Sequence, residues 1–396
     1  MPTPEDDLYL SAEEAAGALG ISLPTLYAYV SRKNIRSIKV EGSRSRKYWA
    51  ADIERLRKLK PAAGVSGDSP SVGAQSSITL LTDKGLYYRG QDVTQLATNA
   101  SVEAVAELMW QSEGAFQAPA PRRPKNTGAL LKAVADLAVG EKLVALFPLL
   151  ERENPRAHDL SVDGYARTGV DVVRWFAALL VGAAAPDDRP LHRFIAESLG
   201  VNDALADLIR QVLILSIDHE LDPTTYSVRA AANTGITPYY AAIVGIASSR
   251  GRHLAYGRNE SVARLLDDIC TARNPADPVV QRFREDGRIL GFGSNQHGES
   301  DPRATFLLQS LHRLFARDAE FRSLLEAAEV AEELTGQPMD FILLLTFIGR
   351  KLGLQGQEIA LAGVGRAIGW IAHASEQYHQ HPLLRPRARY TGTLPD

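Results

Sequence analysis

Apolar residues recur at spacings of three and four along much of the chain after residue 78, and this period constrains the fold more than any other feature. Such spacing puts apolar side chains on one face of an α-helix, whereas a half-buried strand requires alternation. The period is clearest in residues 129–146, 164–181, 205–217 and 323–334. Alternating strand patterns are nearly absent there. We therefore predict that residues 78–396 form one large, all-α domain.

A low-complexity segment separates this domain from the first sixty residues. Residues 61–77 read PAAGVSGDSPSVGAQSS and contain almost nothing that could build a core. Segments so dense in Gly, Ser, Pro and Ala behave as flexible tethers. A chain of 396 residues is long enough for about two or three domains. We therefore predict a small domain over 1–60, a linker over 61–77 and the large domain over 78–396.

The small domain is predicted to begin with two short helices. Ser11 and Glu14 have the spacing of a capping box ahead of an apolar stripe. Gly20 ends that helix, and Ser22 caps a second helix that has Pro24 in its first turn. Two short helices joined by so few residues are typical of a helix-turn-helix.

A basic hairpin and a third helix follow. Residues 38–40 and 47–49 flank the hairpin turn, and Asp52 is placed to cap a helix over 53–60. This order of elements resembles the winged helix-turn-helix of the MerR and excisionase type. Because basic clusters hold phosphate backbones, the resemblance implies DNA binding through residues 1–60. The candidate contacts are Thr25, Tyr27, Arg32, Lys33, Arg44, Arg46 and Lys47. The alternative is a solvated basic face on an accessory or dimerising domain.

Composition narrows the functional class. A formal net charge of −3 does not by itself indicate a polyanion partner. The single cysteine, Cys270, excludes an internal disulfide and fits a reducing cytoplasm. No charged-then-apolar leader opens the chain, and no apolar run approaches about 18 residues. We expect a cytoplasmic protein that does not enter the membrane. The nine histidines lack ligand spacing on a helix face, so no metal site is predicted.

The stretch that suggests chemistry most directly is GFGSNQHGESDPRA, residues 291–304. Its glycines let the backbone approach a ligand closely. Arg303 can hold a carboxylate with its two-pronged guanidinium. A surface turn that caps the following helix would use the same residues. These residues alone leave both interpretations open.

Several long strings resemble the citrate synthase family over essentially all of residues 78–396. Residues 291–304 are similar to the family's Gly-Phe-Gly-His-Arg-x-Tyr…Asp-Pro-Arg-Ala, with Ser294 and Asn295 in place of His and Arg. In the family's His-x-Asp-His-Glu-Leu-Asn, Ser216 replaces the first His. The matching strings are GLYYRG at 85–90, DHELD at 218–222, PMDF at 338–341, GRAIGWIAH at 365–373 and LRPRARYTG at 384–392.

This resemblance implies a fold and a site. The fold is an all-helical homodimer with a smaller helical domain inserted at about 266–361, after a short strand pair at the start. Asp340 matches the base that removes a proton from acetyl-CoA, although a helix-capping aspartate would look the same. Acetyl-CoA would be a co-substrate, and no permanently bound cofactor is implied. The residues that match the oxaloacetate or citrate ligands are His219, Arg303, Arg366 and Arg385, the last donated by the second subunit.

The two acids of the family are displaced in this chain. Where the family has Leu-His-Gly-Gly-Ala-Asn-Glu, residues 252–260 read RHLAYGRNE. Aligned on Asn259 and Glu260, Ala255 occupies the position of the histidine that polarises the thioester in the family. Ser294 stands at the ketone-protonating histidine. His253 and His297 are the nearest candidates to replace them. Loss of one positioned donor costs roughly a hundred- to a thousand-fold in rate.

Two functional hypotheses follow from this pattern. The lost acids favour a ligand-responsive DNA-binding regulator that keeps an oxaloacetate or citrate site and has weak or no condensation activity. The alternative is a divergent enzyme that condenses oxaloacetate, or a related 2-oxo acid, with acetyl-CoA. The retained Asp340 motivates this second hypothesis, because a pure sensor has no obvious use for a base.

Overall fold

The computed structural model divides the chain into two compact units, unit one (Met1–Ser69) and unit two (Pro70–Asp396). Each unit has a hydrophobic core of its own. In unit one the described residues are 9–19, 23, 26–27, 30, 35–40, 45–50 and 52–53. In unit two they are 75–380 except 83–84, 126, 252–254 and 294–300, and the side chains of 255–257 are not described.

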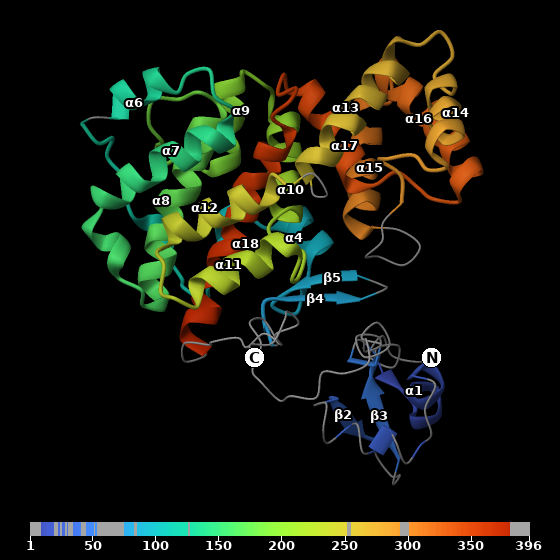
Figure 1. Ribbon diagram of the computed structural model, residues 1–396, viewed down its shortest axis with the longest axis horizontal. Coiled ribbons are helices and arrows are strands. Elements are labelled where there is room, and N and C mark those ends of the chain that lie inside the picture. Colours follow the sequence, from blue (N-terminus) through green and yellow to red (C-terminus); the bar gives the residue numbers. More distant parts are fainter. Residues whose placement is uncertain are drawn as a thin grey trace, which may run out of the picture. The chain divides into compact units, whose positions relative to one another are not determined.

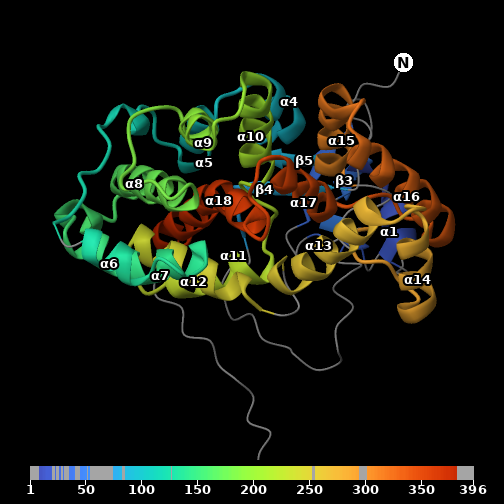
Figure 2. The ribbon, with the colours of Figure 1, turned by 90° about the horizontal axis from the view of Figure 1, so that it is seen from above.

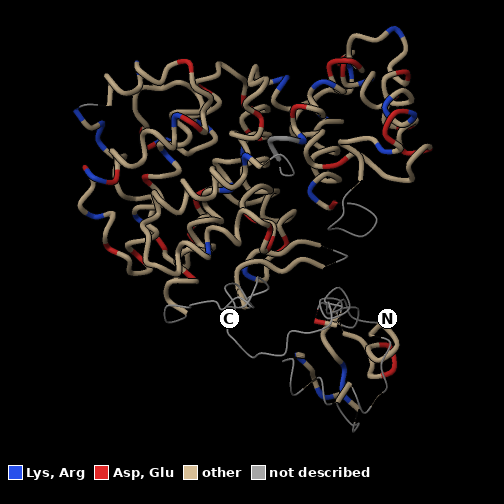
Figure 3. The backbone as a smooth tube through the Cα atoms, in the orientation of Figure 1, with Lys and Arg blue, Asp and Glu red and all other residues tan. Residues whose placement is uncertain are grey.

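Unit one combines helix α1 (Ala12–Leu19) and further helical residues with a small antiparallel sheet. The sheet has the order β1 (Tyr9–Leu10), β3 (Arg46–Trp49) and β2 (Ser37–Lys39). The pairing of β2 with β3 confirms the predicted hairpin. Figure 3 shows basic residues on these two strands and acidic residues on α1.

Local hydrogen bonds explain why α1 begins where it does. The main-chain N–H of Glu14 donates to Ser11 Oγ at 3.2 Å, and that of Ser11 donates to the Glu14 carboxylate at 2.8 Å. This confirms the predicted capping box. Asp52 accepts from the main-chain N–H, Nε and Nη2 of Arg36, each at 3.0 Å. Ala50, Asp52 and Ile53 are helical, so this helix begins before Asp52, and the prediction that Asp52 caps it was wrong. Its predicted continuation over 54–60 lies outside the described residues.

Unit two opens with three short strands, where the family resemblance implied a strand pair. They form the sheet β4 (Thr79–Thr82), β5 (Gly85–Tyr88) and β6 (Gln91–Asp92), all antiparallel. The next helix, α4 (Val93–Asn99), begins here because the Asp92 side chain accepts the N–H groups of Thr94 and Gln95, at 2.8 and 3.1 Å.

The core of unit two is organised around α18 (Glu358–Gln380), most of whose residues are buried. Figure 2 shows α18 running between α8 (Val162–Leu180) on one side and α11 (Pro223–Ala232) and α12 (Pro238–Ser249) on the other. It also contacts α10 (Asp203–Leu215). Because α18 touches so many neighbours, its side chains reach both the core and the candidate site.

Two glycines let α18 approach the end of α10 closely. A Cβ added at Gly365 would lie 2.2 Å from the carbonyl oxygen of Leu213, and one at Gly369 would lie 2.0 Å from that of Ile217. Neither position can hold a larger residue without backbone movement. The two glycines are one helical turn apart and therefore share a face. This close approach sets the position of Arg366 on α18.

A smaller group of helices packs together next to this core, on the right of Figure 1. Within it α13 contacts α14, α16 and α17, and α17 also contacts α18. A domain boundary at about 266–361 remains a prediction. The group consists of α13 (Ala255–Thr271), α14 (Asp277–Asp286), α15 (Pro302–Phe315), α16 (Ala319–Thr335) and α17 (Phe341–Lys351).

The remaining helices complete the larger part of unit two. The apolar period noted over 129–146 is divided between two helices, with a break before residue 139. The remaining helices are α5 (Val102–Trp110), η2 (Ala115–Gln117), α6 (Thr127–Ala133), α7 (Val139–Arg152), η3 (Pro155–His158) and α9 (Leu191–Leu199). A search of the described residues finds no helix with the length and apolar character that a membrane span needs.

Candidate active site

A cavity of about 420 Å³ in unit two gathers residues from distant parts of the chain. This volume suits a small organic ligand. Four residues singled out by the sequence analysis line it: His219, Arg303, Asp340 and Arg366. They come from the segment after α10, from α15, from the start of α17 and from α18. The fold therefore brings together the described members of the predicted site.

Asp340 is the N-cap of α17 and is almost fully buried. Its Oδ1 accepts the N–H of Leu343 at 2.9 Å, and its Oδ2 accepts Nη2 of Arg258 at 3.1 Å. Burial raises the pKa of Asp340 above its ordinary value, although the Leu343 N–H and the Arg258 charge partly oppose this shift. Asp340 thus caps a helix and also presents a carboxylate of increased basicity to the cavity.

The glycine-rich stretch meets the Asp340 segment directly. Phe292 pairs with Met339 in an isolated antiparallel bridge. The N–H of Gly293 donates to the carbonyl of Pro338, and that of Asp340 donates to the carbonyl of Gly291, both at 2.8 Å. Both glycines have positive φ, 97° and 81°, a region that other residues rarely adopt. The two predicted motifs therefore build one wall of the site.

Arg303 sits in the first turn of α15. Its Nε and Nη2 donate to the Asp301 carboxylate, with Nη2 at 2.7 Å from Oδ2. Its guanidinium also lies over the Phe341 ring, 4.5 Å from the centroid, a favourable cation–π arrangement. These contacts hold the planar group in one orientation, which favours recognition of a carboxylate.

Arg366 is held by three side chains that surround it. Its Nη1 donates to Asp218 Oδ1 at 3.3 Å, and its Nη2 donates to Thr225 Oγ1 at 2.9 Å and to the Asp222 carboxylate. Burial lowers the pKa of Arg366, but the negative charges of Asp222 and Asp218 raise it by more, so the net shift is upward. The guanidinium stays charged at the cavity wall.

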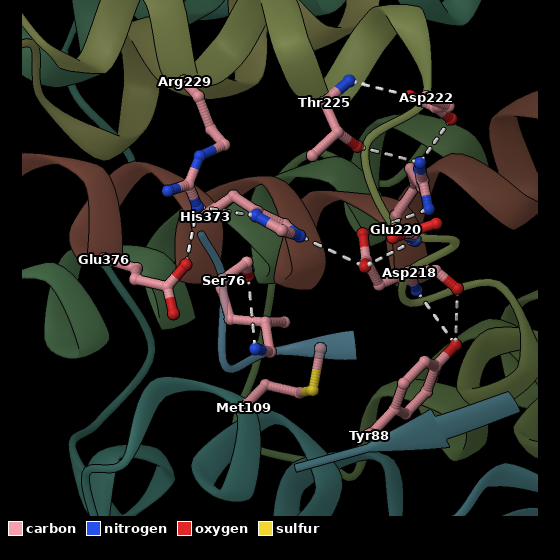
Figure 4. A network of polar contacts seen from close by, with 12 residues as sticks. Ser76, Tyr88, Met109, Asp218, Glu220, Asp222, Thr225, Arg229, His373 and Glu376 are labelled. Carbon is pink, nitrogen blue, oxygen red and sulfur yellow. Dashed lines mark hydrogen bonds and ion pairs between the residues drawn. The ribbon is translucent and has the colours of Figure 1, made fainter. Parts of the chain in front are cut away.

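His219 is presented by a tight turn between Asp218 and Glu220. Glu220 has φ +60°, a left-handed conformation that is uncommon for a residue with a side chain. Its N–H donates to Asp218 Oδ2 at 3.1 Å. The Tyr88 hydroxyl accepts the Asp218 N–H at 2.9 Å and donates to the Asp218 carbonyl at 3.0 Å. Figure 4 shows these contacts around Asp218.

Asp218 is fully buried and remains ionised. Burial alone would raise its pKa, but His373 and Arg366 lower it below the ordinary value. His373 Nε2 lies 3.1 Å from Asp218 Oδ2. Asp218 thus joins the His219 turn to the Arg366 guanidinium.

The remaining predicted site residues fall largely outside the described part of the chain. This holds for His253 and His297, the candidate replacement acids, and for Arg385. Among the described residues no group of three metal-ligating side chains occurs. In unit one, Tyr27 and Arg46 are exposed and Lys47 is half-buried. The other predicted DNA contacts lie outside the described residues: Thr25, Arg32, Lys33 and Arg44.

Sequence reasoning missed three parts of the site. Arg258 lies one residue before Asn259 in the displaced motif, where the family string has alanine, and this departure was the available signal. Asp222 and Thr225 hold Arg366, but sequence alone does not reveal that contact, because the residues are more than 140 positions apart.

The fold and the cavity together define a class of protein. They describe a helical protein whose cavity combines three arginines, a histidine and a desolvated carboxylate. Such a set can bind a small dicarboxylate and transfer a proton beside it.

The comparisons with known proteins name the family: the chain belongs to the citrate synthase family. Residues 70–387 match the family model described as "Citrate synthase, C-terminal domain". Citrate synthase 2 of Bacillus subtilis is 25% identical over 81% of this chain and 94% of its own length. The 2-methylcitrate synthase of Shewanella oneidensis is 26% identical over 85% and 96%.

Solved structures support the same fold. Citrate synthase from Thermotoga maritima superposes with a TM-score of 0.67 at 22% identity, over 81% of this chain and 94% of that one. The Thermoplasma acidophilum enzyme, solved as a ternary complex with carboxymethyl coenzyme A and oxaloacetate, gives 0.66 at 20% identity over the same shares. The family match begins at residue 70, so the winged helix-turn-helix over residues 1–60 and its DNA partner remain predictions.

Proposed function

We propose that unit two is a condensing enzyme that joins an acyl-CoA to a 2-oxo dicarboxylate such as oxaloacetate. The observation that carries the proposal is the shared cavity. Asp340, a buried carboxylate, lines it together with His219, Arg303 and Arg366, which carry groups suited to binding a substrate's carboxylates. The names of the relatives, citrate synthase and 2-methylcitrate synthase, support this function. They favour the enzyme over the regulator that the lost acids had suggested.

The arginines would bind the dicarboxylate. Arg303 uses Nε and Nη2 for Asp301, and among the described residues no hydrogen bond of its Nη1 is found. A substrate carboxylate could accept from that atom while the Phe341 contact keeps the group in place. Arg366 and His219 would hold the second carboxylate and the keto group. Arg385 of the second subunit is expected to complete the set in a homodimer.

The chemistry would begin at Asp340. Its carboxylate removes a proton from the carbon beside the thioester, and the resulting enolate attacks the keto carbon of the dicarboxylate. The keto oxygen gains a proton as the new carbon–carbon bond forms. Water then cleaves the thioester and releases the thiol of coenzyme A. The raised pKa of Asp340 makes it a stronger base than an exposed aspartate.

The thioester oxygen needs a hydrogen-bond donor while it carries negative charge. Among the described residues, Arg258 is suitably placed, because it lines the cavity and contacts Asp340 at 3.1 Å. A guanidinium is always protonated and can therefore stabilise an oxyanion without giving up a proton. His253 and His297 remain the candidates for the acid that protonates the ketone.

The regulator remains a second candidate for unit one. The exposed Arg46 on the β2–β3 hairpin is the described observation that favours it. A DNA-binding arm is compatible with an active unit two. Salt-dependent DNA binding by the full chain that changes with oxaloacetate or citrate would support it, and no binding at low salt would exclude it.

The deciding experiment measures thiol release by the purified full-length protein with oxaloacetate and either acetyl-CoA or propionyl-CoA. We expect turnover that falls at least a hundredfold in Asp340→Asn, because the amide cannot act as the base. Oxaloacetate should still raise the melting temperature of that variant. Equal thiol release by the variant and the native protein would exclude Asp340 as the base. No turnover with either thioester would exclude condensation of these substrates.

A further inference from the structure

A buried polar network extends behind the cavity, away from the ligand. Its central members are Arg229 on α11 and His373 and Glu376 on α18. All three are buried, and none of these described side chains lines the cavity. Figure 4 shows His373 between Arg229 and the Asp218 turn, with Glu376 close to Arg229. Burying charged and polar side chains costs free energy unless their hydrogen-bonding groups have partners. The partners of this network therefore indicate what it holds in place.

Arg229 is held in place by contacts with four residues. Its Nη1 donates to Glu376 Oε2 at 2.6 Å, and its Nε donates to Gln377 Oε1 at 3.1 Å. Its Nη2 donates to the carbonyl of Gln75 at 3.1 Å. Nη1 also lies 3.1 Å from His373 Nδ1. A guanidinium can only donate, so His373 Nδ1 must accept.

This contact determines the tautomer of His373. Since Nδ1 accepts from Arg229, the ring proton is on Nε2, which donates to Asp218 Oδ2 at 3.1 Å. The opposite tautomer would set two donors against each other at Nδ1 and two acceptors at Nε2. Arg229 therefore makes His373 a donor to Asp218.

Asp218 in turn contacts two elements of the proposed ligand site, the turn that carries His219 and the Arg366 guanidinium. Its Oδ2 also accepts the Glu220 N–H, which supports the left-handed turn that presents His219. Its Oδ1 accepts from Arg366. Without the His373 donor, Asp218 could rotate, and both contacts would loosen together.

We propose that His373 is a positioning residue for the dicarboxylate clamp, and that Arg229 fixes its tautomer. His373 acts through Asp218 on the His219 turn and on Arg366, and it touches neither substrate nor reacting atoms. The inference rests on the proposed function of the cavity for the identity of the ligand. The geometry of the turn can be measured without any ligand.

Two variants separate positioning from simple packing. His373→Gln can keep an amide donor near the place of Nε2, whereas His373→Asn can keep an acceptor near Nδ1 and loses the donor to Asp218. Calorimetric titration of oxaloacetate into the full chain should show affinity about tenfold or more weaker in His373→Asn, and closer to native in His373→Gln. The KM for oxaloacetate should rise more than kcat falls. Ser112→Ala, a buried hydroxyl that bonds Asp163 away from this network, is the control and should bind normally.

Amide hydrogen exchange provides the readout without ligand. Exchange at Glu220 should be faster in His373→Asn than in native protein or His373→Gln. Equal exchange and equal affinity in all three proteins would overturn the proposal. If native protein binds no oxaloacetate, the proposed function fails, and the exchange comparison alone decides the role of His373. If His373→Asn does not fold, Asp218→Asn tests the same link and should also speed exchange at Glu220.

Discussion

At the scale of single residues, the ion pair between Arg258 and Asp340 joins two opposing effects. The positive charge lowers the pKa of Asp340, while burial raises it by more. If Arg258 serves as the thioester donor, the enzyme gains oxyanion stabilisation at some cost in the basicity of Asp340. If Arg258 only pairs with the Asp340 carboxylate and blocks its access to substrate, removing Arg258 should leave Asp340 more active as a base. The two roles predict opposite changes in rate.

Replacing Arg258 distinguishes them. We expect Arg258→Ala to lower kcat about a hundredfold, because a positioned donor is lost. The proposed reaction needs ionised Asp340, so turnover should rise as pH passes the pKa of that group. Removing the nearby charge raises this pKa further, so the acid limb of the pH–rate profile should move to higher pH. Arg258→Lys should leave the limb near its native position.

The measurement is thiol release as a function of pH for both variants. Arg264→Ala, an exposed position on the same helix, is the matched control and should change neither kcat nor the limb. A faster Arg258→Ala enzyme would mean that the ion pair inhibits Asp340, and the donor role would be wrong.

Sequence could identify residues that line the cavity, but it identified few of the residues that hold them in place. Asp340, Arg303, Arg366 and His219 stand in long strings similar to a family, and the structure places them around one cavity. The supporting contacts join residues far apart in the chain. The contact between His373 and Asp218, for example, spans 155 positions. Such pairings depend on how helices pack, which a single sequence does not specify.

At the scale of elements, helical period predicted most of the architecture. The segment 205–217 corresponds closely to α10, and 164–181 to α8. The segment 129–146 spans two helices, since α6 ends at Ala133 and α7 begins at Val139. There the Ala138 N–H donates to the Glu141 carboxylate at 3.0 Å and starts a new helix. An apolar period can continue across such a break, so periodicity alone does not reveal it.

The contact between α18 and α10 gives a prediction for stability. We expect Gly369→Ala to lower the free energy of unfolding by about 3 kcal/mol, because the added methyl group would meet a backbone oxygen rather than a movable side chain. The same shift of α18 would displace Arg366 and weaken oxaloacetate binding. Urea unfolding followed by circular dichroism measures the first effect, and calorimetric titration measures the second.

Gly17→Ala is the control for this substitution. Gly17 also lies inside a helix, α1, but a Cβ added there would have nothing within 4 Å. Alanine at this position should stabilise unit one by about 1 kcal/mol and leave oxaloacetate binding unchanged. Native stability and affinity in Gly369→Ala would show that the two helices can separate without cost.

At the scale of the whole molecule, the network behind the cavity connects the cavity wall to the first described residues of unit two. Ser77 donates from its N–H and its Oγ to Glu376 Oε1, both at 2.8 Å. Burial would raise the pKa of Glu376, but the bonds from Ser77 and Arg229 lower it below its ordinary value. In the sequence, Gln75 and Ser77 lie at the end of the low-complexity segment that leads back to unit one. The side chains that hold this segment are therefore joined, through His373 and Asp218, to Arg366 at the cavity wall.

Linkage makes this connection measurable. A ligand that stabilises the ordered network must be stabilised by it in turn. We expect saturating oxaloacetate to slow amide exchange at Ser77 in the full-length protein, because the ordered Asp218 turn favours the orientation of His373, Arg229 and Glu376 that holds the Ser77 N–H. The Phe321 amide, which donates to Asp318 Oδ1 at 3.0 Å on α16, lies outside the network and should not respond.

Glu376→Gln tests whether the effect passes through the carboxylate. Glutamine fills the same space but carries no charge, so it should hold Arg229 and the Ser77 N–H more weakly. In this variant oxaloacetate should still bind, with reduced affinity, and protection at Ser77 should be small or absent. Unchanged exchange at Ser77 in ligand-saturated native protein would mean that the network orders the cavity alone. Equal protection in native protein and Glu376→Gln would mean that the coupling takes another route. If oxaloacetate slows exchange at the Ser77 amide in native protein but not in the variant, ligand binding in the cavity orders residues 75–77. These residues begin the described part of unit two, at the end of the segment that leads to unit one.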